Sequence, residues 1–215
     1  LKTIGRVITP KSGNIYINGK DIYKENPREI AKNMAILPQS PQAPSGLTVE
    51  ELIAYGRFPH QKGFGKANDK DKDIVNWALE ITGIEEFKDR NIDDLSGGQR
   101  QRAWIAMALA QETDILLLDE PTTYLDLAHQ LEILKLLEDL NKNQGRTIVM
   151  VIHEINNAAR FADHMIGIKK GRVVCEGSAD EVMTKENLKE IFNIDAEIVK
   201  DPRTKKPVCI TYDMV

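Results

Sequence analysis

The chain has 215 residues, of which 41% are hydrophobic, and its formal net charge at pH 7 is −4. This length and composition predict a globular protein with one large domain, or one domain with an inserted subdomain. The mild acidity argues against nonspecific binding of nucleic acid, which needs a net basic surface. The longest apolar runs, Ile115–Leu118 and Ile148–Ile152, are too short to cross a bilayer. Cys175 and Cys209 form no metal or redox motif, which favours a reducing compartment.

Turn and capping signals divide the chain into short elements. Asn18-Gly19 is typical of a tight hairpin, Asn26-Pro27 of a helix start, and Thr48 with Glu51 of a capping box. The apolar run Thr147–Ile152 is typical of a strand in a parallel sheet that is covered on both faces. The expected order is a helix end at 1–7, a hairpin at 14–23, a helix from 27, a strand at 34–37, a helix from 48, a loop at 56–68, helices at 71–82 and 99–111, a strand at 114–118, a helix at 129–142, a strand at 147–152, a helix at 155–163, strands at 165–168 and 173–176, two short helices after 178, and a hairpin of 197–200 with 208–212.

This order predicts an α/β protein with a mostly parallel sheet, flanking helices, a helical insertion and an antiparallel β element. Residues 1–215 are expected to form one domain. Residues 40–95 are the inserted helical subdomain, because strand signals stop at Gln39 and return only after Leu95. Residues 177–215 supply the C-terminal helices and the closing hairpin.

The segment Leu95–Gln99 allows two interpretations. Ser96 and Gln99 satisfy the capping-box rule, so the segment could simply start a helix. A cap does not require Gly97 and Gly98, however, and two glycines let a backbone approach an anion at the positive end of a helix. On this second interpretation the Ser96 hydroxyl and the Gly98 amide are phosphate donors.

Two carboxylates, Asp119 and Glu120, follow the apolar run Ile115–Leu118. A buried strand that ends at two solvated acids is common. The catalytic alternative is that Asp119 holds Mg²⁺, directly or through water, while Glu120 polarises an attacking water in phosphoryl transfer. Gln39 and His153 also follow expected strands, and such folds bind ligands at strand ends. The Gln39 amide could coordinate the metal or its water.

In this order the motifs resemble those of the ATP-binding-cassette (ABC) ATPases along essentially the whole chain. The matching segments are the Q-loop Gln39, the signature loop Leu95–Gln99, the Walker B strand Ile115–Asp119, the catalytic Glu120, the D-loop ending at Asp126 and the switch His153. The resemblance implies ATP and Mg²⁺ as cofactors. It also implies a homodimer in which the signature loop and Asp126 act on the partner's nucleotide, while the other site residues act within the subunit.

One motif of that family is missing from the sequence, because no G-x-x-x-x-G-K-[ST] occurs between Leu1 and Val215. Residues 1–4 resemble the helical residues that come shortly after that loop. The resemblance therefore implies that the P-loop, the first strands and an aromatic residue that stacks on adenine lie upstream of Leu1. We expect the 215-residue chain alone neither to bind ATP tightly nor to hydrolyse it.

The segment Tyr55–His60, together with Asp201-Pro202 and Lys206-Pro207, is similar to the ATPases of iron-siderophore importers, in particular the ferric-hydroxamate (ferrichrome-type) group. The resemblance implies that the helical subdomain receives the permease subunits at the cytoplasmic face of the cell membrane. A siderophore-binding protein takes part indirectly. His60 has no second metal ligand near it in sequence, so it is expected to be a surface loop residue.

Three other classes of protein share some of these features. Chromosome-maintenance and DNA-repair ATPases have the signature loop, but residues 39–95 show no sustained heptads of a coiled coil. Translation factors with paired cassettes need a second cassette and a charged linker, which this sequence lacks. The third alternative is a non-catalytic cassette that serves only as an interaction module, which the missing P-loop motif favours.

Overall fold

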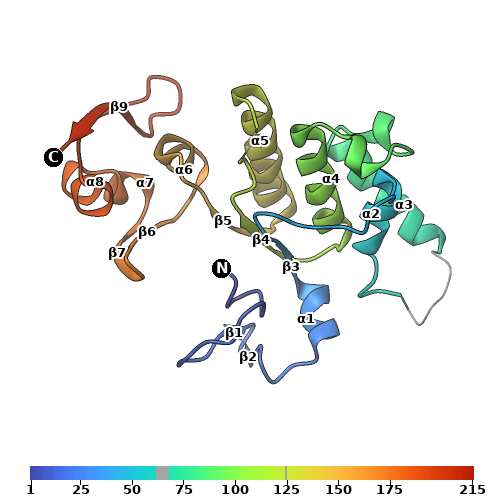
Figure 1. Cartoon of the computed structure of the whole chain (residues 1–215). Helices are drawn as coiled ribbons and strands as arrows, with labels where there is room; N and C mark the ends of the chain where they lie inside the picture. The colour runs from blue at the N-terminus through green and yellow to red at the C-terminus, as the bar shows by residue number, and fades with distance from the viewer. Residues whose placement is uncertain (62–67, 124) are drawn as a thin grey trace. The chain divides into compact units, whose positions relative to one another are not determined.

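The computed structural model describes residues 1–61, 68–123 and 125–215, which form two compact units, 1–151 and 152–215. Figure 1 gives the element labels along the chain. The predicted loop at 56–68 forms turns up to Pro59 and His60, and its residues 62–67 lie outside the described part. No helix in the described ranges combines the length and apolar character needed to cross a membrane.

The first unit is built on a parallel sheet of strand order β3–β4–β5. Register pairs Leu37 with Leu118 and Asp119 with Val151, so the three strands end at the same edge. The parallel sheet, flanking helices and antiparallel hairpins expected from the sequence are confirmed. The described elements of this unit are β1 (Tyr16–Ile17), β2 (Lys20–Asp21), α1 (Pro27–Asn33), β3 (Met34–Leu37), α2 (Val49–Tyr55), α3 (Asp69–Ile81), the short 3₁₀ turns η1 (Glu85–Phe87) and η2 (Ile92–Asp94), α4 (Gly97–Ala110), β4 (Ile115–Asp119), α5 (Leu127–Gln144) and β5 (Thr147–Val151).

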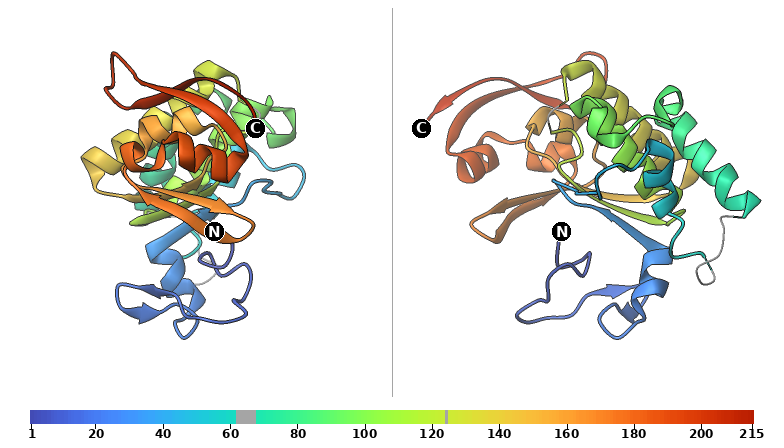
Figure 2. Two further views of the ribbon diagram at one scale, coloured as in Figure 1. Left: turned by 90° about the vertical axis from the view of Figure 1, so that its left-hand side faces the viewer. Right: turned by 45° about the vertical axis from the view of Figure 1, so that its right-hand side comes forward.

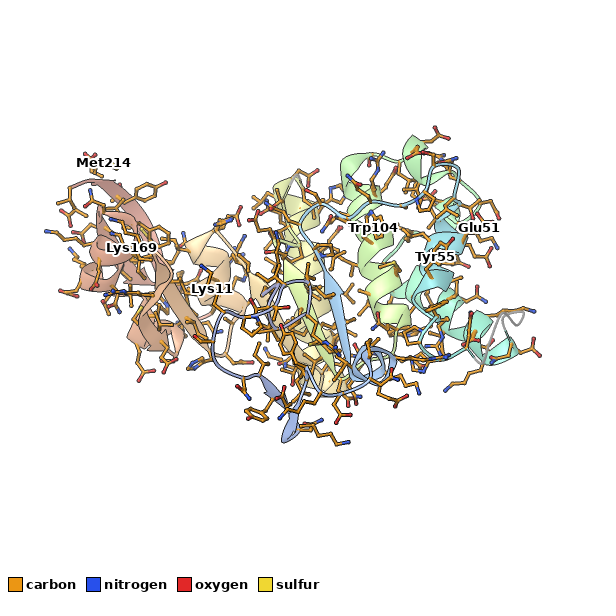
Figure 3. The ribbon with its side chains drawn as sticks, turned by 60° about the horizontal axis from the view of Figure 1, so that its bottom comes forward. Lys11, Glu51, Tyr55, Trp104, Lys169 and Met214 are labelled. Carbon is orange, nitrogen blue, oxygen red and sulfur yellow. The ribbon has the colours of Figure 1, made fainter. Side chains whose placement is uncertain are left out.

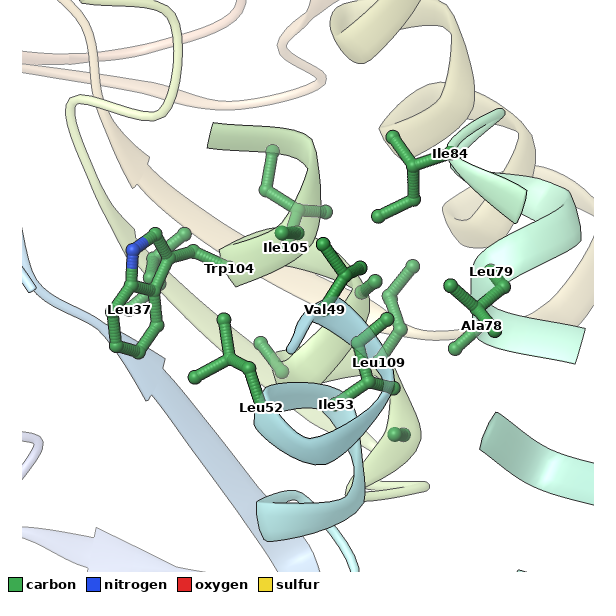
Figure 4. Packing of buried hydrophobic residues seen from close by; sticks show 14 of the residues in the cluster. Leu37, Val49, Leu52, Ile53, Ala78, Leu79, Ile84, Trp104, Ile105 and Leu109 are labelled. Atoms are coloured by element: carbon green, nitrogen blue, oxygen red, sulfur yellow. The ribbon is translucent and has the colours of Figure 1, made fainter. Parts of the chain in front are cut away.

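Alternate strand residues carry the main core. Leu37, Leu116 and Leu118 are at most 1% exposed and belong to a cluster with residues of helices α2 to α5. Those helices lie on one side of the strands, as Figures 1 and 2 both show, and Figure 4 shows α2, α3 and α4 meeting at Ile53, Leu79 and Leu109. Because side chains alternate between sheet faces, the odd-numbered Leu117 points to the opposite side.

That opposite face is covered only in part. Leu117 and Met34 are buried, but Val149 on β5 is 40% exposed, so the predicted covering of both faces is wrong at this strand. The covering comes from α1 and the amino-terminal turn, which pack at the β3 edge. Gly5 lies so close to Ile36 that a Cβ added there would approach the Ile36 Cδ1 to 2.2 Å.

The predicted helix end at residues 1–7 is not a helix in the structure. Residues 2–6 form turns instead. The Gly5 N–H donates to the Leu1 carbonyl at 2.9 Å, and then Arg6 takes a left-handed φ of 58°. The Val7 N–H donates back to the Lys2 carbonyl, a pattern that ends helices. One closed turn is too short for a stable helix because nucleation is unfavourable.

The tight turns occur where the sequence predicted them. Asn18 and Gly19 both have positive φ and join β1 to β2. Lys170 and Gly171, between the two strands predicted at 165–168 and 173–176, also have positive φ and join β6 to β7. Positive φ at both central residues matches the right-handed twist of a two-residue hairpin.

The second unit, Ile152–Val215, has its own small core. Asn156 on α6 fixes β9, because its side chain donates to the Cys209 carbonyl at 2.9 Å and accepts from the Cys209 N–H at 2.8 Å. The closing hairpin is longer than expected. The elements of this unit are α6 (Ile155–Phe161), β6 (Met165–Lys169), β7 (Arg172–Gly177), α7 (Ala179–Val182), α8 (Lys185–Phe192), β8 (Ile194–Lys200) and β9 (Pro207–Met214).

Replacing a core leucine of α4 should destabilise the first unit strongly. Leu109 is 1% exposed, whereas Leu127 is 71% exposed. We expect Leu109→Ala to lower the free energy of unfolding by about 2–5 kcal/mol, through lost burial and a residual cavity. The matched change Leu127→Ala should alter it by less than about 0.5 kcal/mol. Urea titrations followed by tryptophan fluorescence test this, since both tryptophans, Trp77 and Trp104, lie in this unit. Equal effects of the two changes would contradict the assigned core.

Candidate nucleotide site

The signature loop is a capped helix start. Ser96 is the N-cap of α4, and its Oγ accepts from the Gln99 N–H while the Gln99 side chain accepts from the Ser96 N–H. Gly97 and Gly98 are therefore the first residues of the helix, two positions earlier than expected. The first amides of a helix have no partner within it. The capping box is confirmed, and it places two glycine amides at the positive helix end, where the predicted anion would bind.

The D-loop packs beside the signature loop. The Gln101 side chain donates to the Pro121 carbonyl at 3.0 Å. A Cβ added at Gly98 would lie 3.4 Å from the Leu125 side chain. Asp126, the next residue, is the N-cap of α5. Two segments expected to act on the nucleotide of a partner are thus in contact within one unit.

The register of β3 and β4 brings Gln39 to Glu120. Leu37 and Leu118 are paired, so the residues two positions after each member of this pair, Gln39 and Glu120, come together. The Gln39 Nε2 donates to the Glu120 Oε2 at 2.7 Å, across 81 positions of sequence. Sequence spacing predicted both residues at strand ends, and the structure joins their side chains directly.

Glu120 is held in an unusual backbone conformation. Its φ is 54°, in the left-handed region that non-glycine residues rarely enter. The Thr123 hydroxyl donates to the same Oε2 at 3.0 Å. A left-handed φ costs on the order of 1 kcal/mol for a non-glycine residue, and it persists where surrounding contacts hold the residue in place, often at functional sites. For Glu120, the Gln39 amide and the Thr123 hydroxyl supply such contacts.

Thr123 is the site residue that sequence reasoning missed. The sequence analysis assigned no role to it, although its hydroxyl lies only three positions after the expected catalytic carboxylate. Side-chain hydroxyls commonly bond to groups a few positions away in turns. That local rule was the available signal.

The metal-binding expectation can be compared with the donor groups present. Asp119 ends β4, partly buried, and the Gln39 amide also carries an oxygen. Among the residues that the structure describes, no group of three or more histidine, cysteine or acidic side chains is arranged to hold a metal alone. One carboxylate supplemented by phosphate oxygens and water is how Mg²⁺ is usually bound in nucleotide enzymes, so the donor set fits that ion.

His153 belongs to the second unit. It follows β5 by two positions and precedes α6, and it is exposed. Val151, at the end of β5, is paired with Asp119. The role of His153 beside a phosphate stays a prediction, as do the roles of Asp119, Glu120 and the signature loop.

The fold and this arrangement of carboxylates and capped glycines define a nucleoside-triphosphate-hydrolysing cassette. The profile of the ABC transporter family matches residues 1–123, more than half of the chain. The chain belongs to the ATP-binding subunits of that family, which are ATPases.

Named relatives are similar in sequence to this chain over nearly its whole length. The iron(3+)-hydroxamate import ATP-binding protein FhuC of Bacillus subtilis is 66% identical over 215 residues, covering all of this chain and 80% of that protein. The ferric enterobactin transport ATP-binding protein FepC of Escherichia coli K12 is 42% identical, covering 98% of this chain and 78% of that protein.

Solved structures of ABC cassettes are similar to this chain in fold. A metal-chelate type ABC transporter in an inward-facing conformation is similar with a TM-score of 0.75 at 30% identity, covering 83% of this chain and 72% of the other. A dimeric ATP-binding cassette bound to ADP and phosphate in a post-hydrolysis state has a TM-score of 0.72 at 30% identity, covering 82% and 78%.

The Asp126 carboxylate should titrate at an unusually low pH. The backbone N–H of His129, and after it the His129 ring, hold the pKa of Asp126 below the ordinary value of an aspartate. Because the folded-state pKa is lowered, the ionised cap stabilises the start of α5 at neutral pH, and this contribution is lost as the pH falls through that pKa. A carbon-detected NMR titration measures it.

The variant His129→Gln separates the two causes. It keeps the backbone N–H and removes the ring, so the pKa of Asp126 should rise only part of the way towards its ordinary value. A pKa of Asp126 that did not move at all would mean that the ring contributes nothing.

Proposed function

We propose that this chain is the ATP-binding subunit of an importer for ferric siderophores, most specifically of the hydroxamate type. The family assignment supplies the ATPase. The substrate class rests on the named relatives, which import iron(3+)-hydroxamates and ferric enterobactin. The Tyr55–His60 segment points to the same group of importers.

The main structural observation behind this proposal is the contact between the signature loop and the D-loop. Ser96, Gly98 and Asp126 are anchored as helix caps and first-turn residues in one unit, with Gln101 and Leu125 linking the two segments. This supports a surface that faces the nucleotide of a second cassette, in a homodimer. The Ser96 hydroxyl and the Gly97 and Gly98 amides donate to its terminal phosphate, and Gln99 holds the cap in place.

Within the subunit, Glu120 is the proposed general base. Gln39 and Thr123 orient its carboxylate, which accepts the proton of the attacking water. Asp119 and the Gln39 amide would hold Mg²⁺ or its waters, where positive charge would offset the negative charge of the phosphate oxygens. His153 is proposed to contact the same phosphate.

The partners follow from the proposed domain organisation of residues 1–215. Residues 40–95 are the helical subdomain that docks on the permease at the cytoplasmic face of the membrane. Tyr55 and Phe58 expose 52% and 69% of their surface near α2, and exposed aromatic side chains often mark such docking sites. Figure 3 shows Tyr55 and Glu51 on α2 beside Trp104 of α4. A siderophore-binding protein delivers the substrate to the permease, and residues 177–215 close the domain without nucleic-acid contacts.

A linked-pair assay tests the proposed trans action. The chain is joined by a flexible linker to a helper cassette that carries G-x-x-x-x-G-K-[ST] and whose own signature serine is replaced by arginine. Linking raises the effective concentration of the chain to about the millimolar range. We expect the pair to hydrolyse Mg²⁺-ATP, since the helper holds the nucleotide and this chain supplies the signature loop.

Two controls make the assay decisive. Ser96→Ala in this chain should lower kcat of the pair by about 10²-fold, the usual effect of losing one preorganised donor. The unlinked 215-residue chain should show no activity, because its sequence contains no P-loop motif. The proposed function fails if Ser96→Ala leaves the rate unchanged. Activity of the unlinked chain that disappears in Glu120→Gln would show that it needs no helper.

Permease docking has its own test. The chain should bind nanodiscs that contain the permease of a ferric-hydroxamate importer more tightly than nanodiscs with the permease of a sugar importer. Phe58→Ala should weaken that binding by about tenfold, through loss of an exposed aromatic anchor. Phe192→Ala, a matched change at a phenylalanine 46% exposed in the second unit, should leave it unchanged. Equal binding to both permeases would remove the support for a siderophore importer.

A further inference from the structure

The segment that follows α2 packs directly against the far end of the signature helix. Gly56 touches the last turns of α4, because a Cβ added to it would approach the Met107 carbonyl oxygen to 2.2 Å and the Ala110 Cβ to 3.1 Å. No side chain fits in that space. The glycine therefore permits a backbone-to-backbone contact that any other residue would push apart.

Arg57, the next residue, is a fully buried cation. It is 2% exposed, and its guanidinium donates hydrogen bonds from Nη1 to the Ala110 carbonyl at 2.6 Å and from Nε to the Asp71 Oδ1 at 2.8 Å. Its Nη1 also forms an ion pair with the Glu112 Oε2 at 2.9 Å, in the turn after α4. Asp71 lies in the first turn of α3 and is itself buried. A planar fork of donors is required to satisfy this geometry, and lysine does not have one.

The position of Arg57 suits the end of a helix. Ala110 is the last residue of α4, and its carbonyl is one of those that a helix leaves without a partner. A positive charge there is also favoured by the helix dipole. Arg57 thus satisfies an acceptor and complements the partial negative charge of the same helix terminus.

Neighbouring contacts complete the attachment. A ring nitrogen of His60 lies 2.8 Å from the Gln111 carbonyl, so His60 lies in a turn, as expected of a loop residue, but is partly buried by a contact that the sequence did not predict. The Gln111 side chain in turn donates to the carbonyls of Ala31 and Met34, where α1 passes into β3. The C-terminal end of α4 is therefore fixed to α1, β3, α3 and the segment after α2.

We propose that Arg57 is a positioning residue for the signature loop. The helix α4 has 14 residues and spans about 21 Å, with Ser96 at one end and the Arg57 contacts at the other. A helix behaves as a rigid rod over this length, so the direction fixed at Ala110 determines where Ser96 and Gly98 stand. The inference rests on the proposed trans action of the signature loop, and it assigns a role to the Tyr55–His60 motif beyond marking a subfamily.

The chemistry requires such positioning. Phosphoryl transfer depends on groups held in place before the reaction, and a displacement of about 1 Å can cost on the order of 10²-fold in rate. Loss of the hydrogen bond from Arg57 to the Ala110 carbonyl would let α4 tilt about its buried middle residues. The amides of its first turn would then stand away from the phosphate, with little change in how the helper cassette binds ATP.

The linked pair with the helper cassette tests this. Arg57→Lys keeps the charge and loses the fork, so kcat should fall about tenfold while KM for ATP stays within twofold. Gly56→Ala should give the same pattern without any change of charge, because it pushes α4 away at Met107. Asp71→Asn keeps Arg57 but removes the negative charge that pairs with it, so a smaller fall in kcat is expected. Arg90→Lys, at an exposed arginine of the same helical region, is the matched control and should leave kcat unchanged.

The readouts distinguish positioning from simple support of the fold. Circular dichroism and thermal unfolding establish that each variant is folded at the assay temperature. A lower Tm with unchanged kcat in both Arg57→Lys and Gly56→Ala would overturn the inference. If Arg57→Lys does not fold, Gly56→Ala and Asp71→Asn decide by the same criterion. If Ser96→Ala is also without effect, the proposed function itself has failed. If Ser96→Ala lowers kcat as expected, only the inference about Arg57 is lost.

Discussion

The parallel register of β3 and β4 determines where the proposed catalytic residues of this cassette meet. Because Leu37 pairs with Leu118, strands β3 and β4 both end at the same edge of the sheet. Gln39 and Glu120 therefore meet there, although 81 positions separate them in sequence. A slip of one residue would turn every strand side chain to the other face, removing Leu116 and Leu118 from the core. The apolar core and the polar site are therefore specified by the same set of backbone hydrogen bonds, and neither can change alone.

Helix α4 connects the signature loop at its start with the contacts of Arg57 at its end. Its start carries a capping box and two glycines, and its end carries the contacts of Arg57 and Gln111. Between them, Ala103, Ile105 and Leu109 are buried among residues of the other helices. Polar contacts at each end and an apolar middle give the helix one defined orientation, which the proposed action of the signature loop on a second cassette requires.

Local rules predicted much of this structure. Asn18-Gly19 specified a hairpin because few other pairs accept positive φ at both positions, and Ser96 with Gln99 specified a helix start because their side chains satisfy orphan amides. Motif order was enough for the family. Rules of this kind act within a few residues, which is why the element list and its order were largely correct.

The remaining features depend on packing between distant segments. His60 was expected at the surface, but its partner Gln111 lies 51 positions away. The apolar run at Thr147–Ile152 indicated a strand covered on both faces, but apolar character does not specify which elements reach Val149. The contact of His60 and the covering of β5 are tertiary, and residue spacing carries no direct signal for them. Thr123, by contrast, bonds to Glu120 only three positions away, so a local turn rule was available for it.

Burial of the Arg57 contacts has a consequence for the surroundings in which the protein operates. The Arg57 and Asp71 side chains are 2% and 5% exposed, so dissolved ions cannot come between them, whereas exposed pairs such as Lys72 with Asp69 are screened at physiological ionic strength. The attachment of the helical region to the signature helix is therefore insulated from changes in the salt content of the medium.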